Sequence, residues 1–437
     1  MQTLRVAFTT LGCPKNEADS DAMRARVMSS EYELTDSLEE SDVIVLNTCS
    51  FIEDATQESI DTILAIAEEH LGVGDRSLIV TGCMPSRYGD ELVAEFPEVA
   101  AFVAIADQGD IVSVIERITG IPAFMEGRSY DAILRTVDAP FAYVKISEGC
   151  DRSCAFCAIP LIRGPYRSRG LSDVVEEVSA LVASGVREIV LVGQDTGIWG
   201  RDLQGSPSIA DLLRAVSRAA EDAWVRIMYL QPAGVTDELL DTMRELSNVV
   251  EYFDIPLQHA SRSVLRAMHR SGDGAAFLEL LDRIRTRVPG AVIRTTLIAG
   301  FPGETEDDFD ELLTFIENAR FDYVGVFPYS PEAGTSAAEL SGQIPDEVRL
   351  ERAQEVRDLA DAISADIAES RVGSTVTVLV EGYESDGERE EPLGRWRGQA
   401  PEIDGAVHLD TDAEPGTFIE VRLTDTFAYE FEGAVVD

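Results

Sequence analysis

Short apolar runs rich in Val, Ile and Thr alternate with polar, helix-period stretches at the start of the chain. The runs LRVAFTT, SDVIVLNT and RSLIVTG each end in a polar turn that leads into such a stretch. This alternation predicts parallel strands with helices on both faces of one sheet. We place this α/β domain at residues 1–118 and interpret the poorly periodic stretch 119–135 as a linker.

The pattern of a strand followed by a helix then repeats six times. The predicted strands are FAYVKIS, REIVLVG, WVRIMYL, YFDIPL, AVIRTTLIA and YVGVFPY. Six consecutive units predict a curved, partial (β/α)6 barrel, which we place at residues 136–368. Thr305, with Asp308 three residues later, predicts a capping box at the start of one helix. A long helical pattern from Pro345 to about Arg371 ends this segment.

From Val372 onward the pattern changes to short β-branched runs separated by Gly, Pro and acidic turns. These runs predict a small antiparallel β-barrel of about five strands, which we place at residues 371–437. The fold class expected for the whole chain is therefore α/β, with a parallel-sheet domain first, a partial barrel in the middle and a small β-barrel last.

The composition narrows the classes of partner. The 437 residues include 36 basic and 80 acidic side chains, a net charge of −44, and Lys15 and Lys145 are the only lysines. This balance argues against binding nucleic-acid phosphates or anionic membranes and is compatible with a basic protein partner, although it is also typical of solubility or salt adaptation. Because no apolar run can span a bilayer and no secretory signal is visible, we expect a cytoplasmic protein.

Three cysteines lie close together after the first strand of the repeated segment: Cys150, Cys154 and Cys157, in EGCDRSCAFCAIP. Three thiolates at this spacing bind three irons of a 4Fe-4S cluster and leave the fourth iron open, and Gly149 lets the loop curl around the cluster. Structural zinc is the alternative, but it needs a fourth ligand, and no histidine lies nearby in the sequence, since His70 and His259 are both at least 80 residues away. A disulfide framework is not expected in a cytoplasmic chain of this length.

Cys13, Cys49 and Cys83 are far apart in the sequence, but each follows a predicted strand by one to three residues. The intervals between them, 36 and 34 residues, correspond to one β/α unit each. Since the carboxyl ends of parallel strands meet at one edge of a sheet, we expect the three thiols to converge there and to hold a second cluster with one open iron. The alternative is three small hydrophobic side chains buried in the core.

The cysteine loop after the first barrel strand resembles the radical S-adenosylmethionine enzymes. Two three-cysteine sites in this order resemble the methylthiotransferase family along the whole chain. Five stretches resemble the branch of this family that modifies a protein: LGCPKNEADSD, GCMPSRYGDEL, IPLQHA, TTLIAGFPGETEDDF and GVFPYSPEAGT. The resemblance implies an N-terminal cluster domain, a radical S-adenosylmethionine core and a C-terminal TRAM barrel. The implied cofactors are two 4Fe-4S clusters and S-adenosylmethionine.

The implied reaction adds a methylthio group to the β-carbon of an aspartate in a basic protein of the small ribosomal subunit, the twelfth in the usual count. One S-adenosylmethionine methylates a sulfur at the N-terminal cluster, and a second yields the radical that takes hydrogen from the β-carbon. Direct sulfur transfer then requires both open irons to face one cavity. The implied partners are this ribosomal protein, alone or within the assembled ribosome, and an electron donor such as flavodoxin or ferredoxin.

Two other functions fit parts of this pattern. A tRNA adenosine methylthiotransferase of the same family needs an RNA-binding TRAM barrel. Residues 371–437 hold sixteen acidic residues, five arginines and no lysine, a net charge of −11, so we do not expect direct RNA binding. A two-cluster iron–sulfur electron carrier is the alternative from another class, but fully ligated four-cysteine sites would be typical of it.

The resemblance also implies a cofactor pocket, and no catalytic side chain beyond the cluster ligands is expected. The candidates for this pocket are Gly193, Gln194, Asp195, Gln258, Arg294 and Gly300. Ordinary strand-to-helix turns explain several of them equally well. His259 is expected to be a hydrogen-bonded wall residue. Three arginines are candidates to hold a carboxylate of the substrate or cofactor, or else to pair with surface acids: Arg163, Arg167 and Arg169.

Overall fold

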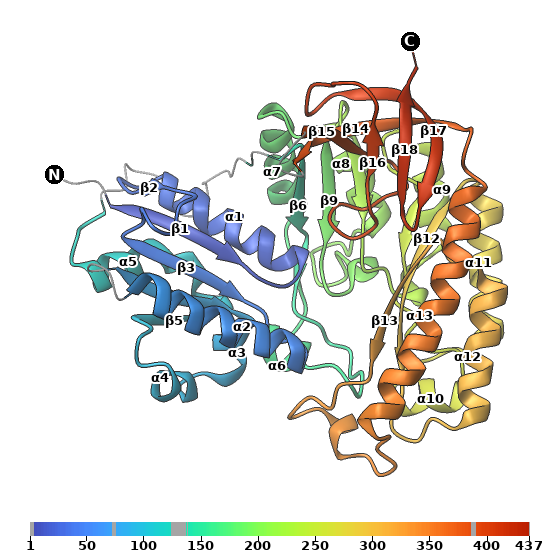
Figure 1. Cartoon of the computed structure of the whole chain (residues 1–437), viewed down its shortest axis with the longest axis horizontal. Coiled ribbons are helices and arrows are strands. Elements are labelled where there is room, and N and C mark those ends of the chain that lie inside the picture. Colours follow the sequence, from blue (N-terminus) through green and yellow to red (C-terminus); the bar gives the residue numbers. More distant parts are fainter. Residues whose placement is uncertain (1–3, 72–75, 124–136, 138, 386–389, 437) are drawn as a thin grey trace.

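The computed structural model describes residues 4–71, 76–123, 137, 139–385 and 390–436, and the described chain forms three parts (Figure 1). An N-terminal α/β domain lies beside a central core, and a C-terminal β-barrel sits on one end of that core. The fold class expected from the sequence is confirmed. No helix in the described ranges has the length and apolar character needed to cross a membrane.

The N-terminal domain is a parallel sheet with the strand order β2-β1-β3-β4-β5. Its strands are β1 (Arg5–Thr10), β2 (Glu33–Leu34), β3 (Val43–Thr48), β4 (Ser77–Gly82) and β5 (Ala101–Ala104). Its helices are α1 (Pro14–Met28), α2 (Glu53–Ile66), α3 (Cys83–Tyr88), α4 (Glu91–Glu95) and α5 (Ile111–Thr119). The three predicted strands are β1, β3 and β4, whereas the short β2 and β5 lie outside the predicted runs. The central β3 is buried along its whole length, as expected for a parallel strand covered on both faces.

The core contains the six predicted parallel strands in two sheets, β10-β9-β6 and β11-β12-β13. The strands are β6 (Phe141–Lys145), β9 (Glu188–Val192), β10 (Trp224–Ile227), β11 (Tyr252–Asp254), β12 (Val292–Ala299) and β13 (Tyr323–Pro328). One parallel bridge, between Val225 and Val249, joins the two sheets, while β6 and β13 have no strand between them in the described chain. The predicted partial (β/α)6 barrel is therefore confirmed, with its open side between the first and last strands.

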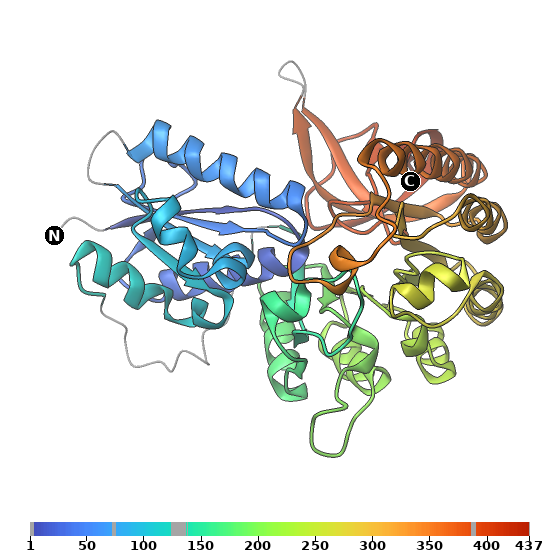
Figure 2. The ribbon, with the colours of Figure 1, turned by 90° about the horizontal axis from the view of Figure 1, so that it is seen from below.

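Helices surround the outside of this barrel as an arc, which is seen end-on in Figure 2. They are α7 (Leu171–Ala183), α8 (Ile209–Ala219), α9 (Asp237–Glu245), α10 (Arg262–Ala267), α11 (Gly274–Arg287), α12 (Glu306–Ala319) and α13 (Asp346–Glu369). The short α6 (Ile159–Arg163), which follows the cysteine loop, lies against α3 of the N-terminal domain instead (Figure 1). A short antiparallel pair, β7 (Ser147–Glu148) and β8 (Arg167–Ser168), flanks the cysteine loop. The capping box predicted at Thr305 and Asp308 is present at the start of α12, and the long helical pattern forms α13.

The C-terminal part is a closed barrel with the strand order β14-β15-β16-β18-β17. Its strands are β14 (Thr375–Ser385), β15 (Glu390–Trp396), β16 (Val407–Leu409), β17 (Phe418–Phe427) and β18 (Glu430–Val435). The predicted small β-barrel is confirmed: its other neighbouring strands pair antiparallel, and β16 and β18 run parallel. A closed ring with an odd number of strands cannot alternate direction throughout, so one parallel pair is unavoidable.

The neighbouring parts attach to different regions of the core. The N-terminal domain packs α1 along β6, where Asp19 pairs with Lys145, and contacts the segment after β13, where Arg87 lies 2.8 Å from Glu332. It therefore lies across the open side of the barrel. The C-terminal barrel covers the amino ends of the core strands. Most of the predicted linker 119–135 lies outside the described residues, and the proposed domain boundaries stay predictions.

Candidate active site

The three N-terminal cysteines share the carboxyl edge of the first sheet. Cys13 precedes α1 after β1, Cys49 follows β3, and Cys83 opens α3 after β4. Cys49 and Cys83 are buried and hydrogen-bonded to each other, and this contact lowers the pKa of Cys83 and raises that of Cys49. Cys13 lies close enough to act electrostatically on Cys49 and adds to the rise of its pKa. Three residues far apart in the sequence thus meet at one place.

The chain around these cysteines allows a close approach. Gly12 has a φ of 99°, and a Cβ atom at this position would lie 2.6 Å from the Cβ of Cys49, so a larger residue does not fit. The buried Asn16 donates hydrogen bonds to main-chain carbonyls at the ends of β1 and β3, at 2.8 and 3.0 Å. Its Oδ1 lies 3.7 Å from the sulfur of Cys83. Asn16 therefore ties together the turns that carry the three thiols, a role that the sequence pattern did not reveal.

Arg163, at the end of α6 in the core, reaches into this edge of the N-terminal sheet. Its side chain is 1% exposed, and one guanidinium nitrogen lies 3.8 Å from the sulfur of Cys83. It donates hydrogen bonds to three side chains: Asn16 (2.7 Å), Glu148 (3.0 Å) and Asp19 (3.2 Å). Lys145 pairs with the same two carboxylates. Arg163 is thus part of a buried network between the domains and is not a surface ion pair.

The second site is a single loop between β7 and α6 that carries Cys150, Cys154 and Cys157. Gly149 has a φ of 70°, and a Cβ atom there would lie 2.3 Å from the carbonyl oxygen of Pro165. The main-chain N–H of Arg152 donates to the sulfur of Cys150 at 3.4 Å, and the guanidinium of Arg270 lies 3.8 Å from the sulfur of Cys154. Hydrogen bonds to sulfur of this kind are typical of iron–sulfur sites.

The two cysteine sites face each other. Cys83 packs against Ala158 and Ile162, which follow the cysteine loop of the core. Burial raises the pKa of Cys157 to about 12, and the ammonium of Lys15 from the N-terminal domain opposes this rise. The carboxyl edge of the first sheet therefore opposes the mouth of the barrel, as direct transfer between the sites requires.

The donor atoms of both sites are thiol sulfurs. Within the described part of the chain, no group of three His, Cys, Asp or Glu side chains surrounds one metal-ion position. Three soft thiolate donors at each site, lined by N–H donors, fit a 4Fe-4S cluster with one open iron.

The predicted pocket residues after β9 lie next to the cysteine loop: Gly193, Gln194 and Asp195. A Cβ atom at Gly193 would lie 2.5 Å from the hydroxyl of Ser147, so glycine is needed for this packing. Gln194 donates to Glu148 at 3.3 Å, and the buried Asp195 accepts from Arg152 at 2.5 Å. Among the described residues, Gln194 Oε1 and Asp195 Oδ1 are buried without a hydrogen-bond partner. These oxygens are available to a ligand.

The other predicted pocket residues do not form one group. Arg294 lies 3.3 Å from Asp404 of the C-terminal barrel and 3.5 Å from Asp254, so its position does not support contact with the cofactor. The N–H of Gly300 donates to Glu304, which also lies 3.2 Å from Nε2 of the fully buried His259. His259 is therefore a wall residue in the structure.

Gln258 and the two remaining arginines complete the set of predicted residues. Gln258 has a φ of 76° and is 8% exposed. Its main chain bridges to β12, and its side chain lines a cavity. Arg169 donates to Glu177 and to a carbonyl of β6, whereas Arg167 is exposed on β8.

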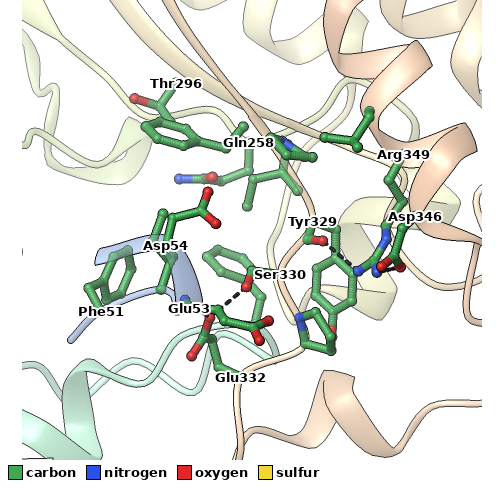
Figure 3. A pocket seen from close by; sticks show the side chains of 17 residues that line it. Phe51, Glu53, Asp54, Gln258, Thr296, Tyr329, Ser330, Glu332, Asp346 and Arg349 are labelled. Atoms are coloured by element: carbon green, nitrogen blue, oxygen red, sulfur yellow. Dashed lines mark hydrogen bonds and ion pairs between the residues drawn. The ribbon is translucent and has the colours of Figure 1, made fainter. Parts of the chain in front are cut away.

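A cavity of about 380 Å³ lies between the N-terminal domain and the core, and Figure 3 shows its lining. One wall is the segment 51–54 after Cys49, and the other is formed by the carboxyl ends of β12 and β13 and the start of α13. Phe156 of the cysteine loop also lines it, so the cavity borders both cysteine sites. Its rim carries the exposed carboxylates of Glu53, Asp54 and Asp346. The sequence pattern did not reveal this cavity, because it forms only where two domains meet.

Three family models match successive parts of the chain. The Uncharacterized protein family UPF0004 matches residues 5–104, the Radical SAM superfamily matches residues 144–316, and the TRAM domain matches residues 372–436. These ranges correspond to the N-terminal domain, most of the core and the C-terminal barrel.

Curated relatives match over nearly their whole length. The chain is 40% identical to "Ribosomal protein uS12 methylthiotransferase RimO" of Pelotomaculum thermopropionicum over 444 aligned residues, which cover 99% of both chains. It is 41% identical to the protein of the same name from Geobacter sulfurreducens, with 99% of this chain and 98% of the relative covered. Among solved structures, the radical S-adenosylmethionine methyltransferase TsrM from Kitasatospora setae has a TM-score of 0.53 at 13% identity, covering 88% of this chain and 82% of TsrM. That likeness shows the fold alone.

The enzymes of this family transfer sulfur and use S-adenosylmethionine and 4Fe-4S clusters. Three findings agree on this family: the arrangement of the three parts, the two facing cysteine sites and the relatives at 40% identity. The chain belongs to the radical S-adenosylmethionine methylthiotransferases, in the branch of the RimO enzymes that act on a ribosomal protein.

Proposed function

We propose that this enzyme adds a methylthio group to the β-carbon of an aspartate in ribosomal protein uS12, the protein in the names of its relatives. The observation that carries the proposal is the meeting of two three-cysteine sites at one cleft. When bound, the clusters and S-adenosylmethionine supply methyl transfer, a sulfur carrier and a radical that takes hydrogen from a C–H bond, chemistry that side chains lack. The protein's task is to hold the reacting groups in line and to exclude water.

We assign the cysteines to two cluster sites. The core cluster, which binds S-adenosylmethionine, is held by Cys150, Cys154 and Cys157. The second cluster is held by Cys13, Cys49 and Cys83. The unpaired oxygens of Gln194 and Asp195 lie beside the core site and are suited to accept hydrogen bonds from the ammonium group or the ribose hydroxyls of S-adenosylmethionine. We place Gln258 in the wall of the cavity between the domains, where it contacts the substrate.

The cavity between the domains is the proposed entrance for the substrate. It borders both cysteine sites, and the exposed carboxylates of Glu53 and Asp54 at its rim suit a basic ribosomal protein, whereas Asp346 is paired with Arg349 of the same lining. The net charge of −11 of residues 371–437 argues against RNA as a partner of the C-terminal barrel. We therefore favour the protein substrate over tRNA. An electron donor such as flavodoxin or ferredoxin and a cytoplasmic site of action complete the proposal.

Mass spectrometry of cells that lack the gene tests the substrate. We expect uS12 from these cells to lack one methylthio group on an aspartate that the parent strain carries, while the tRNA nucleosides of the two strains are identical. A missing methylthioadenosine in tRNA, with uS12 unchanged, would assign the enzyme to the other branch of the family.

Cysteine variants test the two cluster sites. We expect Cys13→Ala, Cys49→Ala and Cys83→Ala each to lower the iron content of the reconstituted enzyme by about half, because one of two clusters is lost. These variants should still cleave S-adenosylmethionine to 5′-deoxyadenosine with dithionite, whereas Cys154→Ala should not. Full iron content in all three N-terminal variants would refute the second cluster. A wild-type enzyme that forms no 5′-deoxyadenosine would point to an electron carrier.

A further inference from the structure

Lys15, in the first turn of α1, is buried and has no anionic partner. The residue is 8% exposed, and its ammonium lies over the ring of Tyr229, 3.7 Å from the ring centroid. Among the described residues no carboxylate pairs with Lys15 and no acceptor receives a hydrogen bond from it. The other lysine of the chain, Lys145, pairs with two carboxylates.

An ammonium group without an anionic partner is unusual in a protein with this many carboxylates. The chain has 80 acidic residues and a net charge of −44, so carboxylates are available to pair with almost any cation. Burying a charge without a partner is unfavourable. A cation that is kept unpaired in a cleft is therefore typical of a site whose anion arrives with a ligand.

Lys15 lies between the two cysteine sites. It follows Cys13 by two residues, and it acts electrostatically on Cys157 of the core loop. Its ring partner, Tyr229, follows β10 at the mouth of the barrel. The main chain of Tyr229 has a φ of 60°, and its N–H donates to Asp254 at 2.9 Å. A left-handed conformation at a bulky residue is strained and persists where the surroundings enforce it, as at ligand clamps.

We propose that Lys15 binds the side-chain carboxylate of the aspartate that the enzyme modifies; this inference rests on the proposed function. The carboxylate is bonded directly to the β-carbon, so hydrogen bonds from the ammonium place that carbon between the two sites. The ring of Tyr229 fixes the ammonium from the other side. Asparagine binds more weakly because its amide carries no charge and offers one acceptor oxygen where the carboxylate offers two.

Binding measurements on the holoenzyme test this role. Labelled uS12 is titrated with enzyme and S-adenosylmethionine in the absence of reductant, and the same is done with uS12 in which the modified aspartate is replaced by asparagine. The enzyme variants are Lys15→Met and Lys15→Arg. The matched control is Arg24→Met, which removes one positive charge from a partly exposed side chain of the same helix.

We expect the wild type and Arg24→Met to bind the aspartate form about tenfold more tightly than the asparagine form, since a hydrogen bond between charged groups has this strength. Lys15→Met should bind both forms equally, and Lys15→Arg should keep part of the preference. Iron content and cleavage of S-adenosylmethionine without uS12 should be those of the wild type in every variant.

Two results would overturn the inference. The first is a Lys15→Met enzyme that keeps the tenfold preference for aspartate. The second is a Lys15→Met enzyme that loses iron or cofactor cleavage, because Lys15 would then serve a cluster or S-adenosylmethionine. A wild-type enzyme that leaves uS12 unmodified would instead refute the proposed function, and it is recognised by mass spectrometry before any variant is made.

Discussion

The two ends of the core barrel meet their neighbours in different ways. At the amino ends of the strands, aromatic rings of the core and the C-terminal barrel pack together, as in the pair Trp224 and Phe418, whose ring centroids are 4.8 Å apart. The carboxylate of Glu188 joins two arginines there: Arg226 of the core (2.7 Å) and Arg395 of the C-terminal barrel (2.5 Å). These three side chains are at most 1% exposed. This end is closed.

The carboxyl ends of the strands meet the N-terminal domain around a cavity, six thiols and a charged network. Several polar groups here have no partner in the described chain, among them the ammonium of Lys15 and one oxygen each of Gln194 and Asp195. Within the described residues, buried polar atoms without a hydrogen-bond partner also occur at the closed end, among them Arg226 Nη1 and Trp396 Nε1, so the cavity and the thiols are what separate the two ends. The comparison teaches that the closed end serves stability and the open end serves chemistry.

The largest effect is expected at the closed end, from Glu188→Gln. This change leaves two buried guanidinium groups without their shared carboxylate, and breaking such a pair lowers the free energy of unfolding by about 3–5 kcal/mol. Denaturant unfolding followed by circular dichroism measures it. The control Glu221→Gln, at an exposed turn, should change the stability by less than about 0.5 kcal/mol. Equal effects of the two substitutions would show that the closed end is not held by its ion pairs.

A smaller effect is expected from Arg163→Met at the open end. The change removes a hydrogen-bond donor to the sulfur of Cys83 and one of the contacts between the domains. The free energy of unfolding should fall by about 1.5–3 kcal/mol, as for other hydrogen bonds to charged groups. The reduction potential of the N-terminal cluster should become more negative, because a donor to sulfur stabilises the reduced cluster. The core cluster should keep its potential.

Redox titration monitored by electron paramagnetic resonance separates the two clusters in this variant. Arg169→Met is the matched control, since Arg169 donates to Glu177 and to a carbonyl of β6 and not to a thiol. Unchanged potentials of both clusters in Arg163→Met would show that Arg163 only connects the domains.

The smallest effect is expected at the rim of the cavity. Glu53→Gln and Asp54→Asn should each weaken binding of the basic protein about two- to fivefold, as exposed ion pairs contribute about 0.2–1 kcal/mol. The loss should shrink at high salt, which screens exposed charges. Titration of labelled uS12 measures both, with Glu95→Gln on the exposed side of α4 as control. A rim variant that binds as the wild type does at low salt would place the substrate elsewhere.

Much of the architecture follows from local patterns. The alternation of strands and helices gave the three parts, and the capping box at Thr305 marked the start of α12. The parallel pair of β16 and β18 was missed, because strand direction in a closed ring depends on the number of strands and not on any one of them. Arg294 was placed in the cofactor pocket by resemblance; in the structure it pairs with Asp404 of the C-terminal barrel, and its contact with the cofactor stays a prediction.

The sequence alone determined the chemistry of this protein. The spacing of Cys150, Cys154 and Cys157 places one site within a single loop. Cys13, Cys49 and Cys83 each follow a strand of one parallel sheet, and such strand ends meet at one edge. Only the tertiary structure decided which charges meet. Arg163 and Asp19 are 144 residues apart, and Lys15 is left without a carboxylate, because pairing between domains depends on how their surfaces dock.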